Sequence, residues 1–232
     1  MSVTQERAAS DASLLARANM DRMYRWQRHI YDLTRKPYLL GRDQVIEQIA
    51  PPPGGRVLEI GCGTGRNLVA AARRWSDASF YGVDVSDEML KAAQASLVRA
   101  QMTSRIQLAW ADATTFDPQR TYNVEAFDRI MFCYTLSMIP DWHAALSRAL
   151  DALAPGGVLL IADFGDQRQL PGAFRRALRT WLSWFHVTPR VEMEQVVREM
   201  ALARGCQCEF RVLYRGYAFL ASISSPSRAV SP

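Results

Sequence analysis

A glycine-rich stretch with an acidic residue in front of it is the part of the sequence best suited to chemistry. It reads VLEIGCGTGRN, and Glu59 stands two residues before glycines at positions 61, 63 and 65. Glycines at this spacing let a chain turn sharply out of a strand and approach a ligand closely. A dinucleotide site has its third glycine one position later, where this chain has Arg66, and a phosphate loop ends in Lys-Ser or Lys-Thr. The stretch therefore predicts a ligand of another kind.

Three acidic residues indicate what that ligand is. Glu59 would repel a pyrophosphate and attract a ligand that carries an ammonium and a sulfonium. Asp84 follows the loop by about 20 residues, at a strand end, and suits a ribose diol. Asp112 follows the next strand and could accept a hydrogen bond from an adenine amino group. Because the three acids stand at the carboxyl ends of consecutive strands, they predict an S-adenosylmethionine site in the crevice where open α/β sheets bind ligands.

The elements that must position these residues alternate between strands and helices. Apolar runs predict strands over residues 56–60, 79–83, 106–111, 127–133 and 158–162. Helices are predicted over 42–50, 66–74, 141–153, 171–185 and 191–204, and a further one is capped by Ser86. Such alternation requires right-handed crossovers and a parallel sheet that is covered on both faces. Two β-like runs, 208–214 and 217–223, could add an antiparallel hairpin at the sheet edge.

Composition limits the remaining possibilities. The chain has 232 residues, of which 49% are hydrophobic, and this predicts one sizeable core rather than a disordered chain. The longest charge-free run is twelve residues, short of the ~20 that cross a bilayer, and the N-terminus does not resemble a secretory signal. The four cysteines are expected as buried thiols in a reducing cytosol. Residues 51–166 hold 10 basic and 13 acidic residues, whereas 167–190 hold five arginines and no acid.

Four motifs resemble the class I S-adenosylmethionine-dependent methyltransferases. They are VLEIGCGTGRN, YGVDVSDEML, ADATTF and LAPGGVLLIADF, and the resemblance covers residues ~50–165. It implies a Rossmann-like α/β fold: a mostly parallel seven-stranded sheet with helices on both faces and a C-terminal antiparallel hairpin. It also implies S-adenosylmethionine as cofactor, S-adenosylhomocysteine as product, and no metal.

The resemblance assigns roles to individual residues. The methionine part of the cofactor would be surrounded by Glu59, Gly61, Gly63 and Asn67. Asp84 would hold the ribose hydroxyls, Val85 would pack on adenine, and Asp112 with Ala113 would bind the adenine edge. The expected cofactor-binding set is completed by Cys62, interpreted as a small residue that fits the loop, and Met89.

Segments outside the cofactor core resemble a narrower family. HIYDLTRKPYLLGRD, TLSMIPDW and WFHVTPR, together with the loop, are similar to the bacterial diacylglyceryl-homoserine N-methyltransferases over residues ~20–190. That family places three methyl groups on a homoserine nitrogen to complete a betaine lipid. Pro37 departs from it, since an aromatic is expected there. The alternatives are a phosphatidylethanolamine or small-molecule methyltransferase of the same fold, or a non-catalytic S-adenosylmethionine-binding module.

The predicted domain plan is a helical lid over residues 1–50 and a methyltransferase domain over 51–232, which form a single folding unit. Tyr24, Tyr31 and Tyr134 could surround a growing methylammonium cation, or they could be core residues. An amine must be neutral to attack, and His29 is the histidine to test as its base. Arg35 or Lys36 could bind the homoserine carboxylate.

Residues 171–190 could lie in a membrane interface. An apolar helix face with arginines beside it is formed by Phe174, Leu178, Trp181, Leu182 and Phe185. Ordinary core packing would explain the same face. The expected partners are a lipid substrate at an anionic membrane surface and the upstream enzyme that makes diacylglyceryl-homoserine, with no nucleic acid. The expected location is the cytoplasm, peripherally on the inner face of the membrane.

Overall fold

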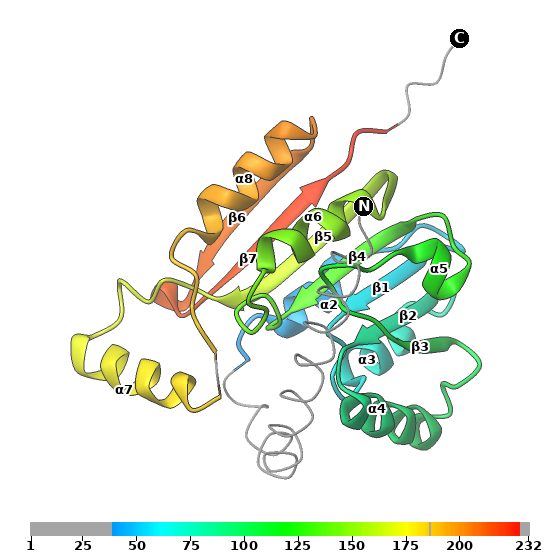
Figure 1. The fold of residues 1–232 in the computed structure, drawn as a ribbon, viewed down its shortest axis with the longest axis horizontal. Helices are drawn as coiled ribbons and strands as arrows, with labels where there is room; N and C mark the ends of the chain where they lie inside the picture. Colours follow the sequence, from blue (N-terminus) through cyan, green and yellow to red (C-terminus); the bar gives the residue numbers. More distant parts are fainter. Residues whose placement is uncertain (1–38, 186, 228–232) are drawn as a thin grey trace, which may run out of the picture.

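The computed structural model describes residues 39–185 and 187–227, and its centre is one seven-stranded sheet (Figure 1). Five of the strands are parallel: β1 (Arg56–Ile60), β2 (Ser79–Asp84), β3 (Ile106–Trp110), β4 (Phe127–Cys133) and β5 (Leu153–Phe164). The strand order is β3-β2-β1-β4-β5-β7-β6. The order reverses between β1 and β4, and ligands bind beside such a switch point in open α/β sheets.

The chain ends in the antiparallel hairpin that its sequence indicates. β6 (Gln207–Leu213) and β7 (Ala218–Ser224) are joined through the short 3-10 turn η1 (Tyr214–Gly216). β7 lies between β5 and β6 and pairs antiparallel with both, so that Ala162 of β5 faces Leu220 of β7. The mostly parallel sheet with an antiparallel end confirms the fold class.

Helices cover both faces of the sheet. One hydrophobic cluster joins the sheet to side chains of α6 (Trp142–Asp151) and α8 (Met193–Ala203), with α5 (Pro118–Tyr122) at its border. The other cluster takes side chains from α2 (Arg42–Gln48), α3 (Arg66–Arg74), α4 (Asp87–Ala100) and α7 (Gly172–Ser183). The central strands β1 and β5 are buried along most of their length, which explains the apolar runs VLEI and VLLIA in their sequences.

Two local differences from the sequence prediction have physical causes. The helix predicted over 141–153 ends at Asp151, and the sequence PGG at residues 155–157, which was expected to end it, lies inside β5 as a bulge. Leu153 pairs with Phe127 and Val158 with Arg129, so the extra residues loop out where Gly156 has a φ of 73°. The short helix α5 was not predicted, although Asp117 caps it by accepting a bond from the backbone N–H of Arg120.

Residues 1–38 of the helical lid predicted over 1–50 lie outside the described residues, so the lid stays a prediction. Its last part is α2, whose Val45 and Ile46 are buried against the sheet. Within the described part of the chain, every helix is too short or too polar to cross a membrane.

Candidate cofactor site

The glycine loop leaves β1 and enters α3 through a tight turn held by β2. The backbone N–H groups of Gly61 and Cys62 both donate to the carbonyl of Val83, at 2.8 and 3.0 Å. Gly61 has a φ of 72°, and a Cβ added there would lie 2.2 Å from Cγ2 of Thr135. A side chain at position 61 is therefore excluded both by the backbone conformation and by the loop that follows β4.

Asp84 fastens this loop to the end of β2. Its Oδ2 accepts a hydrogen bond from the backbone N–H of Gly63 at 2.8 Å, and its Oδ1 accepts one from Ser86 at 2.9 Å. The side chain is 7% exposed. Ser86 in turn caps α4 by accepting a bond from the N–H of Met89. The carboxylate thus shapes two loops at the carboxyl edge of the sheet.

Glu59 is the second buried acid of the site. It is 1% exposed, and its Oε1 accepts a 2.7 Å hydrogen bond from Nδ2 of Asn67 at the start of α3. The bond joins the end of β1 to the first turn of the helix that follows. An acid at this depth gives the site a negative charge in a medium of low polarity, where it attracts a cationic group strongly.

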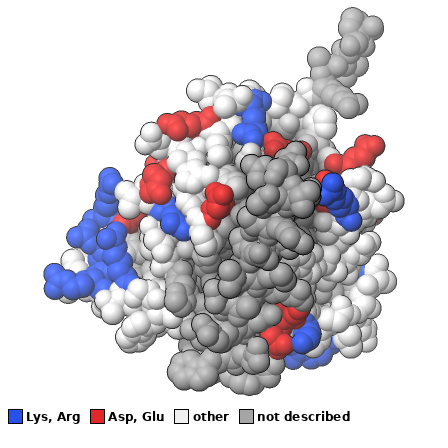
Figure 2. Space-filling view, in the orientation of Figure 1, with Lys and Arg blue, Asp and Glu red and all other residues white. Residues whose placement is uncertain are grey.

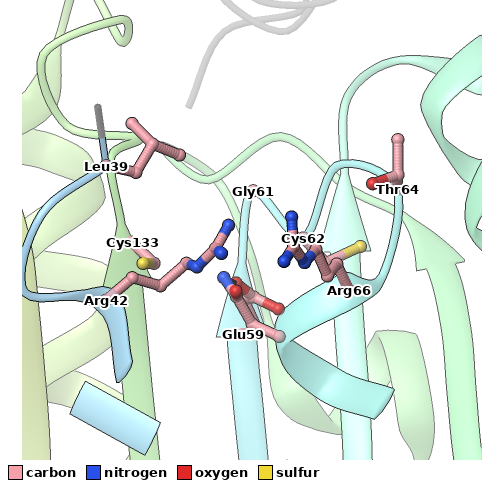
Figure 3. Close-up of a pocket in the computed structure, with 9 residues that line it drawn as sticks. Leu39, Arg42, Glu59, Gly61, Cys62, Thr64, Arg66 and Cys133 are labelled. Atoms are coloured by element: carbon pink, nitrogen blue, oxygen red, sulfur yellow. Dashed lines mark hydrogen bonds between the residues drawn. The ribbon is translucent and has the colours of Figure 1, made fainter. Parts of the chain in front are cut away.

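A pocket opens beside these acids (Figure 3). Four of the residues expected to bind the cofactor line it, namely Glu59, Gly61, Cys62 and Asn67. Gly63 and Asp84 are bonded to each other next to it. The structure therefore brings together the residues assigned to the methionine and ribose parts.

Arg42 lines the same pocket and was missed by the sequence reasoning. Figure 3 shows its side chain extending from α2 toward Glu59. α2 is held in place by Arg129, which donates to the carbonyls of Ile49 and Ala50 at 2.6 and 2.9 Å. The available signal was the GRD at the end of HIYDLTRKPYLLGRD. A guanidinium beside a buried carboxylate provides both charges needed for the zwitterionic end of an amino acid.

Three more pocket residues were not singled out as site residues, and these are Leu39, Thr64 and Cys133. Arg66, which excluded a dinucleotide pattern, also lines the pocket. Cys62 is 5% exposed, and burial together with the charges of Asp84 and Glu59 raises the pKa of its thiol well above the usual value. The thiol stays protonated, which agrees with its interpretation as a small residue that fits the loop.

The residues expected around adenine lie farther along the sheet edge and do not line this pocket. Val85 is partly exposed, and its carbonyl accepts a 2.8 Å bond from the indole of Trp110. Asp112 uses its Oδ1 to accept bonds from the backbone and hydroxyl of Thr114. Ala113 packs against the core, and Met89 is 1% exposed. Their contacts with a cofactor stay predictions.

Of the expected catalytic residues, Tyr134 alone is among the described residues; Tyr24, His29 and Tyr31 lie outside them, as do Arg35 and Lys36. Tyr134 follows β4 with a φ of 58° and is 3% exposed. Its hydroxyl donates to the carbonyl of Leu40, and its ring packs edge-on against Phe164. Burial raises the pKa of the phenol, so the hydroxyl stays a donor.

The segment after β4 and the segment between α7 and α8 are bonded to each other. The carbonyl of Ser137 accepts a bond from the N–H of Thr188 at 3.0 Å, and the carbonyl of Ile139 accepts one from Nη2 of Arg190 at 3.0 Å. Asp163, at the end of β5, accepts the N–H of Ser137 at 2.9 Å. TLSMIPDW and the end of WFHVTPR therefore lie side by side although about 50 residues separate them.

The described residues fit S-adenosylmethionine. The loop closes too tightly for a side chain at position 61, and the buried acids supply the charge that an ammonium and a sulfonium require. Across residues 39–185 and 187–227, no group of three or more His, Cys, Asp or Glu side chains is placed to hold a metal ion.

Comparisons with known proteins agree with a cofactor site of this kind. A family described as a methyltransferase domain matches residues 31–207. A trans-aconitate 2-methyltransferase of Methylobacterium radiotolerans is 38% identical over 45% of this chain and 36% of that protein. An O-methyltransferase of Pyrenophora dematioidea is 28% identical over 73% of this chain and 59% of that protein. The chain thus covers less than two thirds of the length of either relative.

A solved structure shows the same fold. Phosphoethanolamine N-methyltransferase 2 of Haemonchus contortus, in complex with S-adenosylmethionine, superposes with a TM-score of 0.65 at 18% identity, over 80% of this chain and 52% of that one. These comparisons support a methyltransferase and do not support the narrower resemblance to diacylglyceryl-homoserine N-methyltransferases.

Proposed function

We propose a methyl-transfer function from one premise: the chain belongs to the methyltransferase domain family. The reaction that we propose is S-adenosylmethionine-dependent methylation of a small organic acceptor. The observation that carries the proposal is the pair of buried acids at the strand-order reversal, Glu59 bonded to Asn67 and Asp84 bonded to the glycine loop.

Different residues in and beside the pocket would bind different parts of the cofactor. Glu59 would attract the ammonium of the methionine part, and Arg42 would bind its carboxylate. Asp84 would accept bonds from the ribose hydroxyls while its backbone partners keep it in place. When bound, the cofactor supplies an electrophilic methyl group on a sulfonium.

Catalysis would then depend mainly on positioning. Methyl transfer from a sulfonium is an in-line displacement, so the protein accelerates it by aligning the acceptor with the methyl group and excluding water. Glu59 lines the pocket and is 1% exposed, and this burial supports the exclusion of water around the methionine part of the cofactor.

A small-molecule acceptor is supported by the relatives. The trans-aconitate 2-methyltransferases have, by their name, a small acceptor. Each of these relatives is matched over only part of its length, so a panel of acceptors is used to identify the acceptor of this chain.

Turnover is tested by incubating the purified chain with S-adenosylmethionine and a panel of acceptors, with S-adenosylhomocysteine and methylated product measured by mass spectrometry. Glu59→Gln keeps an acceptor for Asn67 but removes the charge, and should weaken cofactor binding about 10- to 100-fold. Glu209→Gln, an exposed change on β6, is the matched control. Cofactor binding without S-adenosylhomocysteine for any acceptor would favour the non-catalytic binding module.

A second candidate acceptor is the amine of diacylglyceryl-homoserine. It is favoured by the contact between the 135–142 and 187–190 segments, which carry part of the narrower resemblance and which the fold joins through Ser137 and Ile139. The panel should therefore include this lipid and phosphatidylethanolamine. Successive gains of one, two and three methyl masses on diacylglyceryl-homoserine would support this candidate, whereas methylation of water-soluble acids or amines alone would rule it out.

A further inference from the structure

Some side chains of the helix α7 are buried in the protein and others are exposed to solvent. Leu178 and Leu182 are buried in the cluster beneath the helix, at 8% and 1% exposure. Phe174 is 52% exposed, and Trp184, directly after the helix, is 67% exposed. Of the predicted apolar face, Leu178 and Leu182 therefore belong to the core, Trp181 packs against the same cluster, and Phe174 is exposed. Trp184, which was not assigned to that face, is exposed as well.

The outward side of α7 also carries positive charge. Arg176 and Arg179 are exposed on it and Arg175 is partly exposed, while residues 167–190 contain no acid. Figure 2 shows basic side chains gathered at the left of the molecule, where Figure 1 draws α7. Among the described residues, no ion pair involves Arg175 or Arg176.

The arginines of α8 provide a contrast. Arg198 pairs with Glu194 at 2.9 Å, and Arg204 pairs with Asp151 at 3.1 Å. An exposed apolar side chain on that helix, Leu202, thus stands beside compensated charges. The exposed Phe174 and Trp184 occur together with Arg175 and Arg176, for which the described residues supply no ion-pair partner. Arg179 differs, since it donates to Gln167 and to the carbonyl of Asp166. We call Phe174, Arg175, Arg176 and Trp184 the α7 surface.

We propose that the α7 surface docks onto an anionic lipid membrane. Phe174 and Trp184 are ten residues apart, which is about 15 Å along a helix, so both could enter the interface while α7 lies parallel to it. Trp and Phe are the side chains that interfacial helices insert, and arginines beside them bind anionic headgroups. Charge complementarity selects an anionic membrane over a neutral one. This surface goes beyond the proposed function, because docking requires neither cofactor nor acceptor.

The test is co-sedimentation of the full chain with vesicles of phosphatidylcholine alone or with phosphatidylglycerol added, at low and high salt, without cofactor. We expect binding to the anionic vesicles only, weakened by salt. Arg176→Ala should weaken it about fivefold, and Trp184→Ser should weaken it further at both salt concentrations. Thermal melting and cofactor binding of the variants establish that they are folded.

α4 offers a matched control, because Val98 is 60% exposed beside the exposed Arg99. The double variant Val98→Ser, Arg99→Ala should bind vesicles as the original chain does, whereas Trp184→Ser, Arg176→Ala should not. Equal binding to neutral vesicles, no binding, or equal loss in both double variants would overturn the proposal. So would a concentration-dependent dimer that only the α7 double variant disrupts, since that surface would then join two copies. Methyl transfer to a water-soluble acceptor is measured separately, so either proposal can fail alone.

Discussion

Replacing Gly61 by alanine tests the reasoning about the glycine loop most directly. A Cβ there would lie 2.2 Å from Cγ2 and 2.8 Å from Oγ1 of Thr135, while the backbone keeps a φ of 72°. The left-handed conformation costs roughly 1–2 kcal/mol for a residue with a Cβ. Overpacking adds roughly 1–3 kcal/mol. We therefore expect a loss of about 2–5 kcal/mol in the free energy of unfolding, with weaker cofactor binding.

Two further variants separate the two contributions. Gly54 also has a positive φ, 69°, but an added Cβ would meet nothing within 4 Å. Gly54→Ala should therefore lose only the roughly 1–2 kcal/mol of unfolding free energy that the left-handed conformation costs. Thr135→Ala removes both clashing atoms and leaves a Cβ at 3.1 Å, so the Gly61→Ala, Thr135→Ala double variant should recover about 1–3 kcal/mol.

Urea unfolding followed by tryptophan fluorescence gives the free energies, and titration calorimetry gives the cofactor affinity. If Gly61→Ala and Gly54→Ala are equally destabilised and Thr135→Ala recovers nothing, close approach of the β4 loop is not the reason for the glycine.

Three other changes have expected outcomes. Asp84→Asn replaces an acceptor of two backbone N–H bonds by a group that accepts one, so it should cost about 1–3 kcal/mol in unfolding experiments and abolish most cofactor binding in calorimetry; unchanged affinity would argue against its ribose role. Arg42→Ala should weaken cofactor binding about tenfold or more while the urea midpoint stays the same, since its side chain lines the pocket rather than the core. Burial raises the pKa of Asp163, so the folded state holds its proton more tightly than the unfolded state. The contribution of the Asp163 proton to the free energy of unfolding is complete below about pH 4 and is lost as the pH rises through the raised pKa. The original chain should therefore lose stability relative to Asp163→Asn as the pH rises from about 4 through that pKa. Urea midpoints that change in parallel for the two chains over this pH range would contradict a raised pKa of Asp163.

Local patterns in the sequence predicted most of the fold because each carries its own physical reason. The apolar runs of β1 and β4 begin and end where predicted, since buried parallel strands need continuous apolar residues. Ser86 caps α4 as expected, because its hydroxyl accepts a helix N–H. β5 was predicted too short, since proline and glycines that stop a helix also permit a bulge.

Side-chain direction could not be predicted in the same way. Tyr134 stands at the carboxyl end of β4, where topology alone places it near the crevice, but its backbone has a positive φ and its hydroxyl reaches Leu40. Arg42 was overlooked because its approach to Glu59 depends on the docking of α2, which Arg129 fixes from 79 residues away. Contacts of this kind join segments that are far apart in the chain, and no local sequence pattern predicts them.

The sequence by itself determined the α/β alternation, the glycine loop and the acids that line the strand ends, because glycine conformation, strand burial and charge act within a few residues. The tertiary structure decided which of those side chains meet in one pocket, that Arg42 joins them, and that α7 buries Leu178 and Leu182 while Phe174 stays exposed. These depend on how helices pack across the sheet, where burial of apolar area outweighs any single local preference.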